Sequence, residues 1–186
     1  MDILAAFGLS ASAGLNAYIP LLVVSLLARF TNIIQLSEPW SAVESWWIIG
    51  LLIVLSLIEF FADKIPAVNH VNDIVQTFIR PTAGAILFAA SADVVTDIHP
   101  ILSIAAGLLI AGSVHAVKSA AVRPAITATT GGAANVPVSV LEDVISTVLS
   151  ILSIILPIVV GIVLIILAIW IIWWLTKRST KSQVQP

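Results

Sequence analysis

Long apolar segments alternate with short polar ones along the chain, and this alternation predicts a bundle of helices. The apolar segments cover residues 3–30, 46–61, 81–92, 101–123 and 144–175. A helix needs about 20 predominantly apolar residues to cross the hydrocarbon core of a bilayer. Because several segments reach that length, the pattern predicts an all-α integral membrane protein.

The composition is too apolar for a soluble fold. Hydrophobic residues make up 60% of the 186 residues and charged residues 10%, whereas a soluble domain has about 45–50% and about 25%. We expect one transmembrane helical domain over residues 1–176 and a basic, polar cytoplasmic tail over 177–186. The net charge of −2 provides no basic surface for nucleic acid.

Proline and polar residues interrupt the apolar segments and predict broken or kinked helices. A break is expected at Pro20, which removes an intrahelical hydrogen bond. Alternatively, Ala13 and Ala17, four residues apart, would allow a close helix crossing. Residues 68–80 are too polar to cross lipid and are expected to form an amphipathic or interfacial connector before a short span that begins at Pro81.

The positions of lysine and arginine predict the orientation. These residues occur in the polar segments near 64–80 and 118–123 and in the C-terminal tail, whereas the loops near 31–45 and 93–99 carry carboxylates instead. This distribution places both termini in the cytoplasm and requires an even number of spans. We expect about six, with the last apolar segment divided near Pro157.

Two short patterns occur twice and are compatible with an internal repeat. An Arg-Pro pair at residues 80–81 recurs at 123–124, and AGLNAYIP resembles GAANVP, so that Asn16 matches Asn135. Paired apolar segments with Gly and Pro interruptions mark transporter repeats whose broken helices meet near the bilayer midplane. Chance recurrence in an alanine-rich chain is the alternative.

The stretch from His115 to Asp143 gathers polar side chains between very apolar segments. On a helix, His115, Ser119 and Arg123 share one face, with Lys118 on its flank. The helix is expected to end near Arg123, because the residue before a proline avoids the helical region. The ITATTGGAAN segment that follows offers hydroxyl groups and free backbone N–H groups, which together with cations suit an anion. A glycine-rich turn after a helix end with snorkelling cations is the structural alternative.

These patterns predict two sets of site residues. The predicted ligand-binding residues are Asn16, Arg80, His115, Lys118, Ser119, Arg123, Thr127, Thr130 and Asn135. A second set forms either a structural charge network or a cation site, because ionised side chains within a bundle are costly and usually paired or functional. It contains Glu59, Asp63, Lys64, Asp73, Glu142 and Asp143.

Enzyme signatures are missing from the chain. It contains no HExxH, GxSxG or P-loop pattern, and His115 has no nearby carboxylate in sequence that would make a dyad. We therefore expect no catalytic residue, no cofactor and no metal site. The expected partners are the lipid bilayer and a small charged ligand, and association with further copies of the chain is also considered.

Three strings resemble a family of small bacterial integral membrane proteins that is catalogued as a domain of unknown function. They are ASAGLNAYIPLL, EFFADKIP with the following FIRPTAGAI, and HAVKSAAVRPAITATTGGAANVPVSVLED. The resemblance covers residues 8–145 and implies a multi-pass helical protein of the bacterial inner membrane. It implies no substrate and no catalytic residue.

We expect a transporter or flippase-like permease for a small anionic solute or an anionic lipid headgroup, in which His115 couples transport to protons. One alternative is a transporter of divalent cations, or of cations and protons, that uses the membrane carboxylates. A non-transporting scaffold subunit of the membrane is the other.

Overall fold

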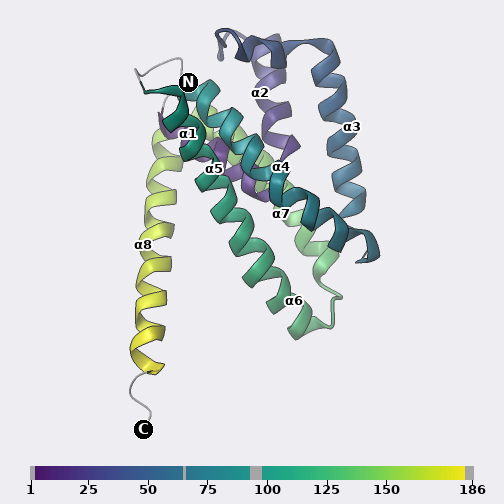
Figure 1. The fold of residues 1–186 in the computed structure, drawn as a ribbon, viewed down its shortest axis with the longest axis vertical. Coiled ribbons are helices and arrows are strands. Elements are labelled where there is room, and N and C mark those ends of the chain that lie inside the picture. Colours follow the sequence, from purple (N-terminus) through teal and green to yellow (C-terminus); the bar gives the residue numbers. More distant parts are fainter. Residues whose placement is uncertain (1–2, 65, 93–97, 183–186) are drawn as a thin grey trace.

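The computed structural model describes residues 3–64, 66–92 and 98–182, and every regular element in these ranges is helical (Figure 1). The α-helices are α1 (Ile3–Leu15), α2 (Tyr18–Phe30), α3 (Trp46–Ala62), α4 (Pro66–Ala92), α5 (Pro100–Val117), α6 (Arg123–Thr130), α7 (Asn135–Ile155) and α8 (Pro157–Ser182). A 3-10 helix, η1 (Trp40–Glu44), precedes α3, and a π-helical segment, η2 (Lys118–Val122), joins α5 to α6. The all-α prediction is confirmed.

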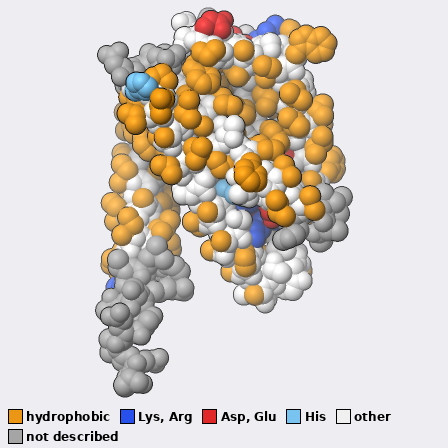
Figure 2. All heavy atoms as spheres, viewed as in Figure 1, with side chains coloured by type: hydrophobic (Ala, Val, Ile, Leu, Met, Phe, Trp, Pro, Cys, Tyr) orange, Lys and Arg blue, Asp and Glu red, His pale blue; other side chains and the backbone are white. Residues whose placement is uncertain are grey.

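The surface and the helix lengths are those of a membrane protein. Three helical stretches are long and apolar enough to cross a bilayer, namely Val71–Ala92, Pro100–Thr130 and Asn135–Ile155. Hydrophobic side chains dominate the face seen in Figure 2, and a few charged ones show between them in its lower half. The expected count of six spans is not confirmed, because α1, α2, α3 and the apolar part of α8 are shorter.

Helix α1 lies at the centre of the bundle, where it packs against α4, α5, α7 and α8. Its residues from Ala5 to Gly14 are almost all small, and all but Phe7 are buried. A Cβ atom on Gly8 would collide with Ser153 of α7, and one on Gly14 would collide with Val114 of α5. Small side chains on α1 therefore allow its neighbours to approach closely.

The break in the first apolar segment lies at Asn16 and Ala17, four residues before the expected position at Pro20. The Asn16 Oδ1 atom accepts hydrogen bonds from the backbone N–H groups of Tyr18 (3.1 Å) and Ile19 (3.0 Å), and so starts α2. Pro20 falls in the first turn of α2. Backbone N–H groups in a first turn have no carbonyl partner within the helix, so the N–H group that proline lacks costs no hydrogen bond there. Ala13 and Ala17 are both fully buried, in agreement with the close crossing.

Helices α1 and α2 form a hairpin that enters and leaves at the same end of the bundle (Figure 1). At that end Ile3 packs against Phe88 and Ala92 of α4, and Arg29 of α2 reaches the carbonyl of Glu44 beside η1. The start of α1 and the end of α8 lie at opposite ends of the molecule. This does not fit the expectation that both termini are cytoplasmic.

The expected connector 68–80 and the short span after it form one helix, α4, which continues through Pro81. Part of the polar face of this segment packs inside the bundle. Gln76 and Arg80 are buried in the bundle, whereas Val71 and Phe78 on the other side of the helix are exposed. The prediction of a separate interfacial helix was wrong, because protein covers its polar face.

The helix that was expected to end near Arg123 also continues, through Pro124 to Thr130. The π-helical turn of η2 precedes this proline, and the N–H group of Arg123 bonds to the carbonyl of Lys118, five residues earlier. The wider turn gives the proline ring room that a regular α-helix lacks. Gly131 (φ 61°) and Gly132 (φ 89°) then end the helix in a left-handed conformation.

The last apolar segment divides at Leu156, beside the expected position at Pro157. Helix α8 extends to Ser182 and so includes the first residues of the expected tail. Residues 183–186 and the predicted acidic loop at 93–97 lie outside the described residues.

Helices α4 and α5 cross where Gly84 faces Gly107. A Cβ atom on either glycine would collide with backbone atoms of the other helix. The two helices are therefore close enough for the Arg80 and His115 side chains to meet across the interface, 3.1 Å apart.

Candidate functional site

Eight charged side chains meet inside the bundle, and we refer to them as the ion network. Its carboxylates are Glu59, Asp63, Glu142 and Asp143, and its cations are Lys64, Arg80, Lys118 and Arg123. All except Lys64 are buried. The formal charges balance at four negative and four positive, as burial in an apolar bundle requires.

Asp63 connects the two arginines of the repeated Arg-Pro pattern. Its Oδ2 atom lies 4.0 Å from Nη2 of Arg80 and 3.6 Å from Nη2 of Arg123. The same oxygen accepts a hydrogen bond from Ser139 (3.2 Å), and Oδ1 accepts one from Asn72 (2.7 Å). Asp63 thus joins α4, α6 and α7 at one point.

Glu142 binds two cations through one oxygen atom. Its Oε2 atom lies 2.7 Å from Nη2 of Arg123 and 3.0 Å from Nζ of Lys118. Lys118 also donates a hydrogen bond to the carbonyl of Leu15 (2.9 Å). That carbonyl is at the C-terminal end of α1, where unpaired carbonyl groups attract a cation.

Glu59 and His115 complete the surroundings of Arg80. Nη2 of Arg80 donates to Oε1 of Glu59 (2.9 Å), and Nη1 lies 3.1 Å from Nδ1 of His115. Because a guanidinium can only donate, Nδ1 must accept, and the proton of a neutral imidazole then lies on Nε2. Nε2 is 3.2 Å from the hydroxyl of Thr77, whose own proton goes to the carbonyl of Asp73.

The break between α1 and α2 brings Asn16 into contact with the ion network. Its side-chain nitrogen donates to Oδ1 of Asp143 (2.9 Å), and Oδ2 of Asp143 lies 3.6 Å from Nζ of Lys64. One asparagine therefore caps α2 and holds a carboxylate of α7. The C-terminal end of α1 and the N-terminal end of α2 both touch buried charged groups.

The structure divides the predicted ligand-binding residues into two groups. Asn16, Arg80, His115, Lys118 and Arg123 come together as described, but the remaining four do not join them. Ser119 bonds to Ala116 of its own helix, because the π-turn moves it off the face expected for a regular helix.

The Thr-rich segment lies at the exposed end of α6. Thr127 and Asn135 bond to each other, and Thr130 bonds to the carbonyl of Ile126. These bonds satisfy the hydroxyl groups locally, so the segment forms the glycine-rich turn that was the structural alternative. Asp73, from the second predicted set, is half-buried and makes no ion pair within 4.0 Å among the described residues.

Sequence reasoning missed Asn72, Thr77 and Ser139, which bond to Asp63 or His115. Asn72 and Thr77 lie in the segment that was predicted to be an amphipathic or interfacial connector, eight and three residues before Arg80 on the same helix. Ser139 lies one turn before Glu142 on α7, at a spacing that puts both on one helical face. Nothing in the sequence indicated that the carbonyl of Leu15 would bind Lys118.

Several buried polar atoms of the site have no hydrogen-bond partner among the described residues. They include Nε and Nη1 of Arg123, Nε of Arg80 and Oε2 of Glu59. A buried polar atom without a partner costs free energy and calls for an explanation. The arginines can therefore donate hydrogen bonds to a further anionic or polar group without losing the ones they already make.

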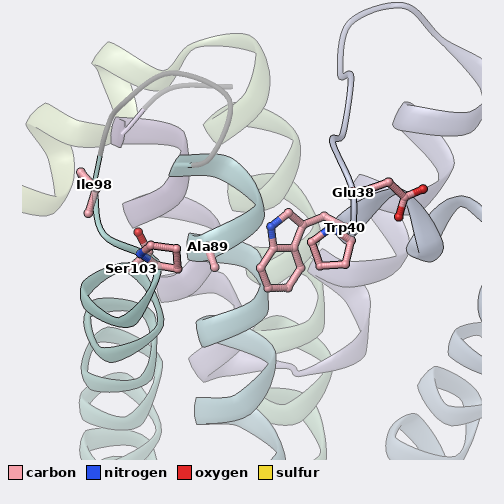
Figure 3. A pocket seen from close by; sticks show the side chains of 7 residues that line it. Glu38, Trp40, Ala89, Ile98 and Ser103 are labelled. Atoms are coloured by element: carbon pink, nitrogen blue, oxygen red, sulfur yellow. The ribbon is translucent and has the colours of Figure 1, made fainter.

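A separate cavity of about 360 Å³ lies at the other end of the bundle, between η1, α4 and the start of α5 (Figure 3). The indole of Trp40 faces Ala89 there, whereas the carboxylate of Glu38 points away from the cavity and accepts a hydrogen bond from Ser41 (2.6 Å). No charged side chain drawn in Figure 3 points into this cavity, so the ion network is the stronger candidate site. The described residues contain no group of three or more metal-ligating side chains arranged for an ion.

Replacing Asp63 by asparagine should destabilise the protein strongly. The change leaves Arg80 and Arg123 without their shared carboxylate, and an uncompensated buried charge costs about 3–5 kcal/mol. Denaturant unfolding in detergent, followed by tryptophan fluorescence, measures the decrease in the free energy of unfolding. Glu38→Gln, at an exposed carboxylate, is the control and should have little effect. Equal stability of the two variants would contradict the role of Asp63.

Residues 3–178 match the model of a protein family described as a domain of unknown function, DUF4126. The matched range contains all eight residues of the ion network and both halves of the broken first segment. No curated protein and no solved structure matches the chain. Because the match covers nearly the whole sequence, the chain belongs to the DUF4126 family.

Proposed function

We propose that this protein is a small membrane permease that binds an anionic solute or an anionic lipid headgroup at the ion network. The broken helix α1–α2 carries the proposal. Both of its inner ends meet the network, through the bond from Lys118 to Leu15 and the bond from Asn16 to Asp143. In secondary transporters, discontinuous helices place such ends at the substrate and ion sites near the bilayer midplane.

The free hydrogen-bonding capacity of Arg123 supports an anion as the ligand. Two of its three nitrogens are buried without a partner among the described residues, and Nε of Arg80 is in the same condition. Charge-assisted hydrogen bonds from guanidinium groups to carboxylate or phosphate oxygens are strong. An anion beside Arg123 would satisfy donors that the carboxylates of the network leave unused.

An entering anion adds a negative charge to a balanced network. We expect it to compete with Glu142, whose single oxygen holds both Lys118 and Arg123. Uptake of a proton by His115 would restore the balance. Nδ1 of His115 accepts a hydrogen bond from Arg80 only while it is unprotonated. A proton on Nδ1 would break this bond, and Arg80 would then be able to donate to the anion. His115 would thereby couple anion binding to protons.

The divalent-cation alternative has less support. Each carboxylate of the ion network already has a cation within 4.0 Å. A metal ion would have to displace these lysines and arginines before it could reach the oxygen atoms. A scaffold subunit is the remaining alternative, and it differs from a permease because it predicts no ligand response.

We place the protein in the bacterial inner membrane with the C-terminal end of α8 in the cytoplasm. The turn after α3 and the C-terminal end of α8 lie in the lower half of Figure 1, whereas η1 lies at its top. Lys64 belongs to that turn, and Lys177 belongs to the last two turns of α8. Glu44 is the last residue of η1 and Glu38 lies just before this element, at the other end. Because cytoplasmic segments are enriched in Lys and Arg, this orientation puts the start of α1 on the outer side.

Inorganic phosphate or sulfate should stabilise the purified protein, because an anion that binds only the folded state shifts the unfolding equilibrium. The free energy of unfolding rises by about 2.7 kcal/mol when the anion concentration is one hundred times the dissociation constant. The six tryptophans report the thermal midpoint. Arg123→Lys keeps the charge but removes guanidinium donors, and it should reduce the shift.

Arg29→Lys is the matched control, since Arg29 is exposed at the far end of the bundle, and it should respond as the natural protein does. Stabilisation by a divalent cation in place of anions would favour the carboxylate transporter. No response to either kind of ion would favour the scaffold.

The orientation predicts opposite labelling of two single cysteines. The chain has no cysteine of its own, so Ala42→Cys in η1 and Thr130→Cys at the end of α6 each provide one reactive thiol. Both positions are exposed. A membrane-impermeant maleimide added to intact spheroplasts should label Ala42→Cys alone, and both variants after permeabilisation. The reverse pattern would show that the orientation is inverted.

A further inference from the structure

A groove between α5, α7 and α8 leads from the apolar surface to the ion network. It consists of two adjoining cavities of about 550 Å³ and about 360 Å³, which share the lining residues Val114, Leu164 and Ala168. Helix α1 contributes Leu4, Phe7 and Ala11 to the smaller cavity. The residues of α8 that line the whole groove run from Gly161 to Ile171. This range is roughly 15 Å long at 1.5 Å per residue.

The lining of this groove is apolar along its length and charged at one place. The charged residues in it are Lys118 and Glu142, and both line the larger cavity. Lys118 is 3% exposed and Glu142 is 8% exposed, so each reaches the groove with a small part of its side chain. A ligand that fills the groove therefore needs a long apolar part and one polar end.

The charge near Lys118 favours an anionic polar end. Lys118 lines the groove and shares one oxygen of Glu142 with Arg123, whose Nη2 atom also lies 3.6 Å from Oδ2 of Asp63. Arg123 also keeps two nitrogens without a partner among the described residues. A phosphate group at the end of the groove would lie beside Lys118 and bond to the unused donors of Arg123. Its charge would be offset as for any entering anion, by displacement of Glu142 and uptake of a proton by His115.

We infer that the groove holds an acyl chain of an anionic phospholipid and directs its phosphate group to Lys118 and Arg123. This inference rests on the proposed function and narrows its substrate class from any small anion to a membrane lipid. A flippase-like permease needs a path on which the headgroup enters the protein while the chains stay in the hydrocarbon. The groove combines an apolar wall with access to the ion network, as that path requires.

A helix from a second copy fits the groove less well. Lys118 and Glu142 line the larger cavity, so an apolar helix that covered the groove would bury these two charged side chains without offering them a polar partner. A flexible hydrocarbon chain is thinner and follows a groove of this shape.

The test compares phosphatidylglycerol with phosphatidylcholine of the same acyl chains, added as mixed micelles, and with inorganic phosphate. Ala168→Trp fills the groove where the two cavities meet. Val163→Trp is the matched control, because Val163 is exposed on the same helix and does not line the groove. The readouts are the thermal midpoint, from which apparent affinity is obtained, and the oligomeric state by size-exclusion chromatography.

We expect phosphatidylglycerol to raise the midpoint of the natural protein and of Val163→Trp more than phosphatidylcholine does. In Ala168→Trp the apparent affinity for phosphatidylglycerol should fall at least tenfold, while the response to inorganic phosphate is retained. That retained response shows that the variant is folded and its ion network intact. Lys118→Gln should lose the preference for phosphatidylglycerol over phosphatidylcholine.

Four results would overturn the inference. A phosphate response without a lipid response would reject the lipid and leave the proposed permease in place, whereas no response to either would reject both. An unchanged lipid affinity in Ala168→Trp would place the lipid elsewhere. A change of oligomeric state in Ala168→Trp alone would assign the groove to a second copy of the chain.

Discussion

The fold depends on the mutual neutralisation of charges that the apolar bundle buries. Seven side chains of the ion network are buried, and removing any one partner leaves a charge that the surroundings cannot solvate. Asp63 has the most connections, because Arg80, Arg123, Ser139 and Asn72 all meet its two oxygens. These contacts fix α4, α6 and α7 around the turn that follows α3.

The helix irregularities follow from the same constraint. The π-turn before Pro124 allows one helix to place both Lys118 and Arg123 within 3.0 Å of Glu142. The break at Asn16 ends α1 where Lys118 can bind its last carbonyl, and it frees the amide group of Asn16 for Asp143. Features that appear in the sequence as defects in apolar segments therefore bring polar groups to one site.

The sequence predicted the membrane class, the division near Pro157 and most of the ion network. The charged residues were identifiable because each interrupts an apolar pattern. The pairing was not, since it joins residues up to 79 positions apart, as Lys64 and Asp143 show. The errors at 68–80 and at Arg123 have different causes. At 68–80, protein and not lipid or water covers part of the polar face. At Arg123, the π-turn of η2 gives the ring of Pro124 room that the local rule for proline assumes is missing.

The binding of an anion beside Arg123 is the central claim for function. It is tested most directly by determining the structure with selenate and locating selenium by anomalous scattering. The account predicts a peak within hydrogen-bonding distance of Nε or Nη1 of Arg123, with Glu142 moved away from Lys118. An occupied selenate site at the surface together with an unchanged ion network would contradict it.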